Sequence, residues 1–247
     1  MSDSTSFAFA LVAEDARCRE LAMVLADRTG SALLDDAWDL DPSLYKDQRA
    51  WRGRAASSPF STRAEFPDPP KFGHGLAQLG WNKDPGAKFI AKVVYAFIDE
   101  SIALLLIAMD QDRDRERAEA QRRARDVASR LVEFPVVLAL MNPEAEAWEI
   151  AAFQPSSDNG RERHATITRS LTFDPVREPD RMTSTSGPPE RDCKAVHRAL
   201  LDGERPCHER PLTELLATAA STGLPAYLGD IHAALRAAFK LPDLPES

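Results

Sequence analysis

The chain has 247 residues, with 31 Lys and Arg against 39 Asp and Glu, so its formal net charge is −8. This length allows a substantial hydrophobic core, and the negative charge argues against a broad basic surface for nucleic acid, although not against a local channel. Three cysteines and the lack of a signal-peptide pattern favour a reducing cytoplasm. No apolar segment reaches the roughly 18 residues of a membrane span, so no membrane association is expected.

The N-terminal region predicts a strand followed by a helix. Residues 7–13 form a short apolar run that leads directly into Glu14. Residues 17–28 then carry apolar side chains on one helical face, and Gly30 is expected to end this helix.

Residues 31–85 are rich in Pro, Gly and Ser and follow neither a strand nor a helix period. We predict a large irregular insertion with short elements of its own, which packs outside the sheet core and shapes access to the functional edge. Helical spacing returns at residues 87–100, which lead into the next strand.

Two unbroken apolar segments, residues 102–109 and 136–141, are typical of strands buried on both faces of a parallel sheet. Residues 115–132 between them predict a helix. Its apolar positions are Ala120, Ala124, Val127 and Leu131. A strand–helix–strand unit of this length is a parallel crossover, which is almost always right-handed.

After residue 153 the pattern weakens, and helices are predicted at 192–202, 212–221 and 228–239. The predicted fold class is α/β: a parallel-sheet core with helices on both faces, a large insertion after the first helix and a helical C-terminal part. We divide the chain into a core, residues 1–155 with the insertion at 31–85, and a mainly helical extension, residues 156–247.

Acidic residues follow all three predicted strands: Glu14, then Asp110 and Asp112, then Glu144 and Glu146. The carboxyl ends of parallel strands share one edge, where open α/β sheets place their ligand sites. Carboxylates gathered there repel one another, and a hard cation such as Mg²⁺ or Mn²⁺ relieves that repulsion. The sequence therefore predicts a divalent metal site that can polarise a phosphoryl oxygen and activate water.

A purely structural alternative exists for some of these acids. Asp114 could cap the helix that follows it, and Asn142-Pro143-Glu144 has the form of a helix start with Asn as cap. This alternative leaves Glu146 unexplained, as well as the coincidence of three acidic strand ends.

The sequence ALLLIAMDQDRD followed by LALMNPEAEAW resembles Toprim domains, and more closely the RloB-like and related Toprim families of bacterial defence loci. Those families combine an Asp-x-Asp after a hydrophobic strand with an Asn-Pro-x-x-Glu-x-Trp signature, which this chain carries from Asn142 to Trp148. The resemblance covers residues 1–155.

The resemblance implies specific roles for the acids. Asp110, Asp112 and Glu146 would hold the metal, and Glu14 would hold metal or act as general acid and base. One departure is that the Glu-Gly pair of the family after the first strand is Glu14-Asp15 here.

The function that the resemblance implies is Mg²⁺-dependent cleavage of DNA or RNA in anti-phage defence. Two alternatives stay open. One is a catalytically silent Toprim-like subunit that binds a partner such as a defence ATPase, and the other is a different Mg²⁺-dependent phosphoryl-transfer enzyme, such as a phosphatase or nucleotidyltransferase. A homo-oligomer is compatible with each of them.

Other candidates carry less weight. Arg113 and Lys194 could contact a substrate phosphate, although a solvated surface lysine is the simpler interpretation of Lys194. A zinc site at Cys193, His197, Cys207 and His208 has a spacing that matches no standard finger. The chain has no Gly-rich phosphate loop and no Gly-x-Ser-x-Gly motif.

Overall fold

The computed structural model describes residues 7–38, 43–55, 58–66, 85–112, 114–183, 189–204 and 207–241. By its internal contacts the chain divides into two compact units. The first contains Met1–Ala108, Glu116–Leu138 and Gly229–Ser247, and the second contains Met109–Arg115 and Ala139–Leu228.

The strands form one sheet in the order β2-β1-β4-β5, with β3 also paired to β1. Their bounds are β1 Phe7–Ala13, β2 Arg49–Arg52, β3 Ser61–Thr62, β4 Leu104–Asp110 and β5 Val136–Met141. β1 pairs in parallel with β2, β3 and β4, with Phe9 opposite Leu104 and Ala13 opposite Ala108. The predicted α/β fold class is therefore confirmed.

Strands β4 and β5 are neighbours, as predicted. Leu105 donates its N–H to Pro135 O at 3.0 Å, and Gln111 donates to Met141 O at 2.8 Å. Because both partners advance by the same number of residues, the two strands run in the same direction. Every residue of β5 and all but the last of β4 are buried, which is the physical reason for their unbroken apolar sequences.

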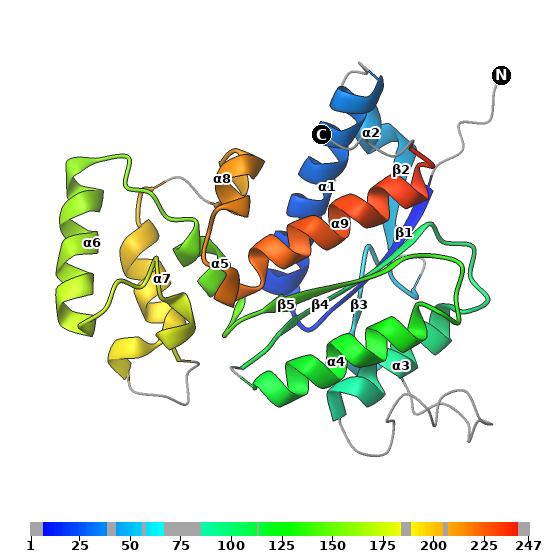
Figure 1. Ribbon diagram of the computed structural model, residues 1–247, viewed down its shortest axis with the longest axis horizontal. Helices are drawn as coiled ribbons and strands as arrows, with labels where there is room; N and C mark the ends of the chain where they lie inside the picture. Colours follow the sequence, from blue (N-terminus) through cyan, green and yellow to red (C-terminus); the bar gives the residue numbers. More distant parts are fainter. Residues whose placement is uncertain are drawn as a thin grey trace. The chain divides into compact units, whose positions relative to one another are not determined.

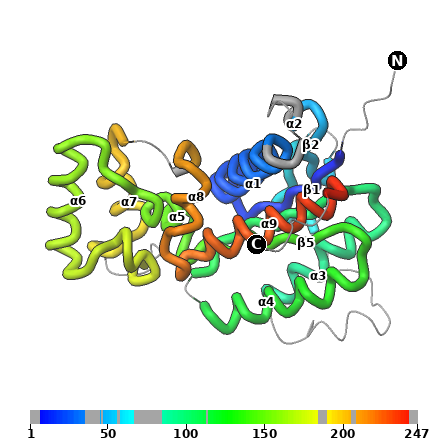
Figure 2. The backbone as a smooth tube through the Cα atoms, turned by 45° about the horizontal axis from the view of Figure 1, so that its top comes forward, coloured from blue at the N-terminus to red at the C-terminus, as the bar shows by residue number. Residues whose placement is uncertain are grey.

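Helices cover both faces of the sheet. α1 (Ala16–Trp38) and α9 (Leu224–Ala238) lie on one face, and α3 (Pro85–Phe97) and α4 (Arg115–Ala128) lie on the other (Figures 1 and 2). On the first face, Phe239, just after α9, packs edge-on against Phe7 of β1 with ring centroids 4.9 Å apart. The buried side of α4 differs from the predicted one, and the helix ends at Ala128. Its buried residues are Ala118, Gln121, Ala124 and Ala128.

The region after α1 differs from the prediction in two ways. α1 does not end at Gly30 but continues to Trp38. Gly30 is needed because a side chain there would collide with the Tyr45 ring. The prediction that residues 31–85 pack outside the sheet core is also wrong for β2 and β3, which extend the sheet. The segments 39–42, 56–57 and 67–84 of this insertion lie outside the described residues.

Strand β2 is held in place by one carboxylate of α1. Asp27 accepts hydrogen bonds from Arg49 Nε at 2.8 Å and from Trp51 Nε1 at 2.9 Å. The Trp51 ring also packs against Phe9, with centroids 5.4 Å apart. This four-residue strand without a hydrophobic period thus pairs with β1 and is also bonded to a helix through polar side chains, which no local pattern signals.

The second unit contains helices and tight turns after the ends of β4 and β5. Its helices are α5 Ala145–Ala151, α6 Asp158–Leu171, α7 Cys193–Leu201 and α8 Leu212–Leu216. The remaining short elements of the chain are α2 Ser43–Gln48 and the 3₁₀ turns η1 Arg63–Glu65, η3 Pro179–Arg181, η4 Pro189–Arg191, η5 Cys207–Glu209 and η6 Ala220–Thr222. The core of this unit joins α5, α6 and α7 through Ile150, Leu171, Val196 and Leu200.

The division by contacts differs from the sequence-based division after residue 155, because α5 belongs with α6 and α7, and most of α9 belongs with the sheet. All described elements between α5 and α9 are helical, with one isolated bridge between Thr183 and Asp192. Among the described residues, no helix combines the length and the apolar character needed to cross a membrane.

Candidate metal centre

Four acidic residues at the ends of β4 and β5 lie in the second unit, and we call them the acidic cluster: Asp110, Asp112, Glu144 and Glu146. The two loops that carry them are joined by backbone hydrogen bonds beyond the last strand residues. Gln111 donates to Met141 O at 2.8 Å, and Asp112 donates to Pro143 O at 3.0 Å. The sheet ladder thus continues into the loops and holds acids from two strands side by side.

Asp112 sits where the chain turns away from the sheet. Its φ of 53° places it in the left-handed region, where Asp is among the few residues found with some frequency. The turn is closed by the N–H of Asp114, which donates to Gln111 O at 3.1 Å. The Asp112 side chain is exposed, so it is accessible to a ligand.

Asp110 has a defined structural contact. Its Oδ1 accepts a hydrogen bond from the N–H of Ala145 at 2.9 Å, so the carboxylate caps the first turn of α5. The interpretation of Asn142 as helix cap is therefore wrong, because α5 begins only at Ala145 and Glu144 occupies the N-cap position without a side-chain bond. Asn142 instead donates its side-chain N–H to Ser221 O at 2.7 Å.

Glu144 is the most unusual member of the cluster. It is only 4% exposed, and its Oε2 has no hydrogen-bond partner within the described residues. Burial raises the pKa of this carboxyl; the ammonium of Lys194, 3.7 Å from Oε1, opposes that rise, and the carboxylates of Glu146, Asp192 and Asp112 add to it. A buried carboxylate oxygen without a donor among other carboxylates is the position that a cation would satisfy.

The thiol of Cys193 shows that the acids share one region. Burial raises its pKa first, followed by the negative charges of Glu144, Glu146, Asp110 and Asp192. Asp192 is a residue that the sequence analysis missed. It caps α7, accepting from Ala195 N–H at 2.7 Å, and its only sequence signal is its place before an amphipathic helix.

The structure places the remaining predicted site residues as follows. Glu14 lies in the first unit, exposed, with its N–H donating to Ala108 O at 2.9 Å, and its role as a metal ligand stays a prediction. Lys194 lies beside Glu144, whereas Arg113 falls outside the described residues. Of the proposed zinc ligands, Cys193 is buried and His197 Nε2 lies 2.6 Å from Glu149 Oε2, whereas the Cys207 side chain lies outside the described residues; the zinc site stays a prediction.

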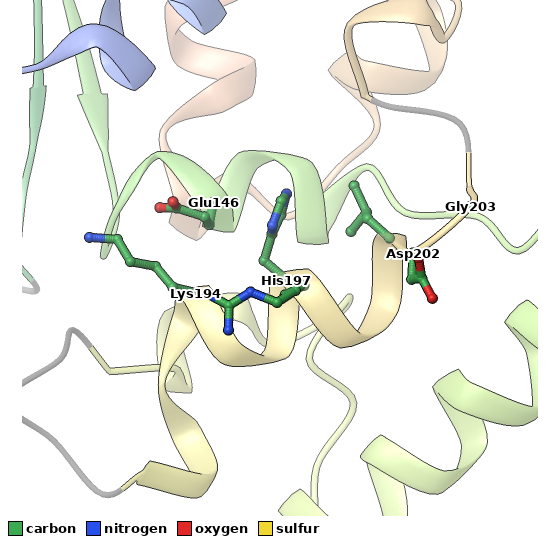
Figure 3. Close-up of a pocket in the computed structure, with 7 residues that line it drawn as sticks. Glu146, Lys194, His197, Asp202 and Gly203 are labelled. Atoms are coloured by element: carbon green, nitrogen blue, oxygen red, sulfur yellow. The ribbon is translucent and has the colours of Figure 1, made fainter.

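A pocket of about 490 Å³ opens beside the cluster within the second unit, and we call it the α7 pocket. It is lined by Glu146, Lys194, His197, Arg198, Leu201, Asp202 and Gly203. Figure 3 shows His197 reaching from α7 toward α5, and Glu146 projecting from α5 near the end of the Lys194 side chain. This pocket was not predicted from the sequence, because its lining residues come from α5 and α7, which lie far apart in the chain.

The donor set of the acidic cluster fits a hard cation. Its ligand atoms are all carboxylate oxygens, which suit Mg²⁺ and Mn²⁺ better than soft metals. The buried Oε2 of Glu144, for which the described residues supply no hydrogen-bond donor, supports the same fit. Comparison of the chain with protein-family models, with curated proteins and with solved structures finds no significant match.

Proposed function

We propose that the chain is a Mg²⁺- or Mn²⁺-dependent hydrolase of phosphodiester bonds in DNA or RNA, with the acidic cluster as its metal site. The buried Oε2 of Glu144, which lacks a hydrogen-bond donor among the described residues and has other carboxylates around it, is the observation that carries this proposal. A cation at this position would satisfy that oxygen and offset the repulsion among the acids.

The four residues of the acidic cluster would hold the ion. Asp110 would in addition fix the start of α5 through its bond to Ala145 N–H. When bound, the ion polarises a phosphoryl oxygen and lowers the pKa of a water molecule. Lys194, beside Glu144, would stabilise negative charge on the phosphate.

The resemblance to Toprim families adds one further role to the proposal: Glu14 would hold metal or exchange a proton with the attacking water. Arg113 follows Asp112 directly in the sequence and would contact the phosphate. The same resemblance supports a cytoplasmic role in anti-phage defence, together with a partner ATPase. In the non-catalytic alternative, the chain would be the partner-binding subunit of such an ATPase.

A second candidate function is favoured by one observation. The α7 pocket, at about 490 Å³, falls within the size range of small-molecule sites. A Mg²⁺-dependent phosphoryl-transfer enzyme that acts on a small phosphorylated molecule would therefore also fit the second unit.

The test compares the wild type with Glu144→Gln, using Glu162→Gln on the exposed surface of α6 as the control. Mg²⁺ should raise the melting temperature of the wild type and of the control by several degrees, since it binds only the folded state. Glu144→Gln should lose most of this shift and most of the Mg²⁺-dependent cleavage of labelled DNA and RNA.

Equal Mg²⁺ shifts in all three proteins would overturn the metal site. Cleavage of p-nitrophenyl phosphate or of mononucleotides without cleavage of any polynucleotide would favour the second candidate. Metal binding without any hydrolysis would favour the partner-binding alternative.

A further inference from the structure

One face of α7 carries the wall of the α7 pocket. Lys194, His197, Arg198 and Leu201 follow the spacing i, i+3, i+4, i+7, which places them on one side of a helix. Three of these four side chains bear nitrogen donors. The opposite wall includes Glu146 of the acidic cluster. The pocket therefore combines a donor-rich helix face with an edge of the candidate metal centre.

The two cations of this face stand one helical turn apart. Lys194 and Arg198 are both exposed, and like charges at i and i+4 destabilise a helix by a few tenths of a kcal/mol. Lys194 is balanced by Glu144, at 3.7 Å. Arg198 forms no ion pair with any residue that the structure describes. The pocket thus presents a guanidinium that is not ion-paired with any described residue, while its lining also includes the carboxylates of Glu146 and Asp202.

His197 is held in a fixed orientation between these cations and α5. Its Nε2 lies 2.6 Å from Oε2 of Glu149, whose side chain is only 3% exposed. When Glu149 is ionised its carboxylate can only accept, so Nε2 donates and Nδ1 is the other polar atom of the ring. A buried carboxylate that orients an imidazole at the wall of an open pocket is an arrangement suited to binding a ligand.

We propose that the α7 pocket binds a phosphate ester, with Arg198 and Lys194 as its charged contacts and His197 as an oriented polar contact. Guanidinium and ammonium groups are the side chains that bind phosphate oxygens most strongly, and Leu201 gives an apolar wall for a sugar or base. This inference rests on the proposed function in one respect, since Glu146 would then set the bound phosphate next to the metal. The phosphate comes either from a nucleic-acid terminus or from a small phosphorylated molecule.

The experiment measures binding in EDTA, so that neither metal nor cleavage contributes. The probes are a 5′-phosphorylated oligothymidylate, the same oligonucleotide with a 5′-hydroxyl, and adenosine 5′-monophosphate. The proteins are wild type, Arg198→Ala, Arg198→Lys and the control Arg169→Ala, which removes an exposed arginine of α6 away from the pocket.

The phosphorylated probe should bind the wild type and the control equally. Arg198→Ala should bind it about tenfold more weakly, as expected for one lost charge-assisted contact, and Arg198→Lys should fall between. Preference for the oligonucleotide identifies a nucleic-acid terminus as the source, and equal binding of the mononucleotide identifies a small molecule. The same dissociation constant for all four proteins, or the absence of binding at millimolar probe, would contradict the proposal that the α7 pocket binds a phosphate ester.

Failure of this inference differs from failure of the proposed function. If Arg198→Ala weakens phosphate binding but Mg²⁺ shifts no melting temperature, the phosphate pocket is supported and the metal centre is contradicted. If Mg²⁺ binds and cleavage occurs, while Arg198→Ala binds the phosphorylated probe and cleaves like the wild type, the metal centre is supported and the phosphate pocket is contradicted.

Discussion

The carboxylate of Asp110 accepts a hydrogen bond from the backbone N–H of Ala145, 35 residues further along the chain, at 2.9 Å. This bond ties the end of β4 to the start of α5. The same carboxylate is a member of the acidic cluster, so one residue has both a structural contact and a proposed functional role.

Two substitutions at Asp110 separate these roles. Asp110→Asn keeps an oxygen that can accept from Ala145 N–H, so its stability in EDTA should stay near that of the wild type. Asp110→Ala removes the cap and should lower the free energy of unfolding by about 1 kcal/mol. Both should lose metal-dependent cleavage. Urea unfolding measures the first effect and a nuclease assay the second. Equal destabilisation by both variants would show that a neutral amide oxygen cannot replace the carboxylate as the cap, and cleavage by Asp110→Asn would remove Asp110 from the site.

Gly223 should be sensitive to substitution and Gly229 should not. Gly223 has a φ of 84°, and a Cβ there would collide with the carbonyl oxygen of Leu140. Gly223→Ala should therefore cost more than about 1 kcal/mol in the free energy of unfolding. Gly229 lies within α9 with no atom near its Cβ position, so Gly229→Ala should stabilise the protein by up to about 1 kcal/mol. Chemical denaturation checks both values, and a neutral Gly223→Ala would contradict the close approach of η6 to β5.

Glu204 should make the second unit sensitive to acid. Its carboxylate accepts from the Ser156 hydroxyl at 2.6 Å, from Ser156 N–H at 2.8 Å and from the Ser157 hydroxyl at 2.7 Å. These bonds lower its pKa from 4.5 to about 2. Because the folded-state pKa lies below the unfolded one, the stabilisation is complete above about pH 4.5 and disappears as the pH falls toward 2.

Glu204→Gln should therefore be less stable than the wild type near neutral pH, and the difference should shrink toward pH 2. Urea unfolding between about pH 2.5 and pH 6 measures this, with Glu162→Gln at an exposed position of α6 as the control. A constant difference between Glu204→Gln and wild type over this range would show that the bonds do not depend on the charge.

Asp27 should be needed to hold β2 on the sheet. Asp27→Ala would leave the half-buried guanidinium of Arg49 and the Trp51 N–H without their acceptor, at a cost of about 1–3 kcal/mol. Asp35→Ala, an exposed position in the same helix, is the control and should change stability little. Hydrogen exchange should show faster exchange of β2 amides in Asp27→Ala alone. Unchanged protection of β2 would indicate that backbone pairing with β1 suffices.

The parts of the fold that sequence analysis predicted are those with a local signal. β1, β4 and β5 are unbroken apolar segments, and burial on both faces is the cause of that pattern. β2 has no such pattern, because it stands at the end of the strand order and none of its residues is buried. α6 was also missed: only Gly160 and Leu171 are buried in it, so it carries almost no apolar period.

In the candidate site, too, the features with a local sequence signal were predicted and those formed by packing were not. Strand-end position was enough to select the acids of the cluster, since sheet geometry brings strand ends together. The start of α5 was misassigned, because the Asp110 cap comes from another strand and leaves no mark in the local sequence. Asp192 and the Glu149–His197 pair were missed for a related reason: the packing of α5 against α7 forms these contacts, and neither helix alone encodes them.

The Cys193 thiol should be alkylated and oxidised slowly in the folded protein. Alkylation and oxidation require the thiolate, and burial together with the surrounding carboxylates disfavours that form here. We therefore expect that modification of Cys193 requires the first turn of α7 to open. The rate at which this thiol is modified should consequently report how often the start of α7 opens locally, and α7 is the helix that carries Lys194 and His197.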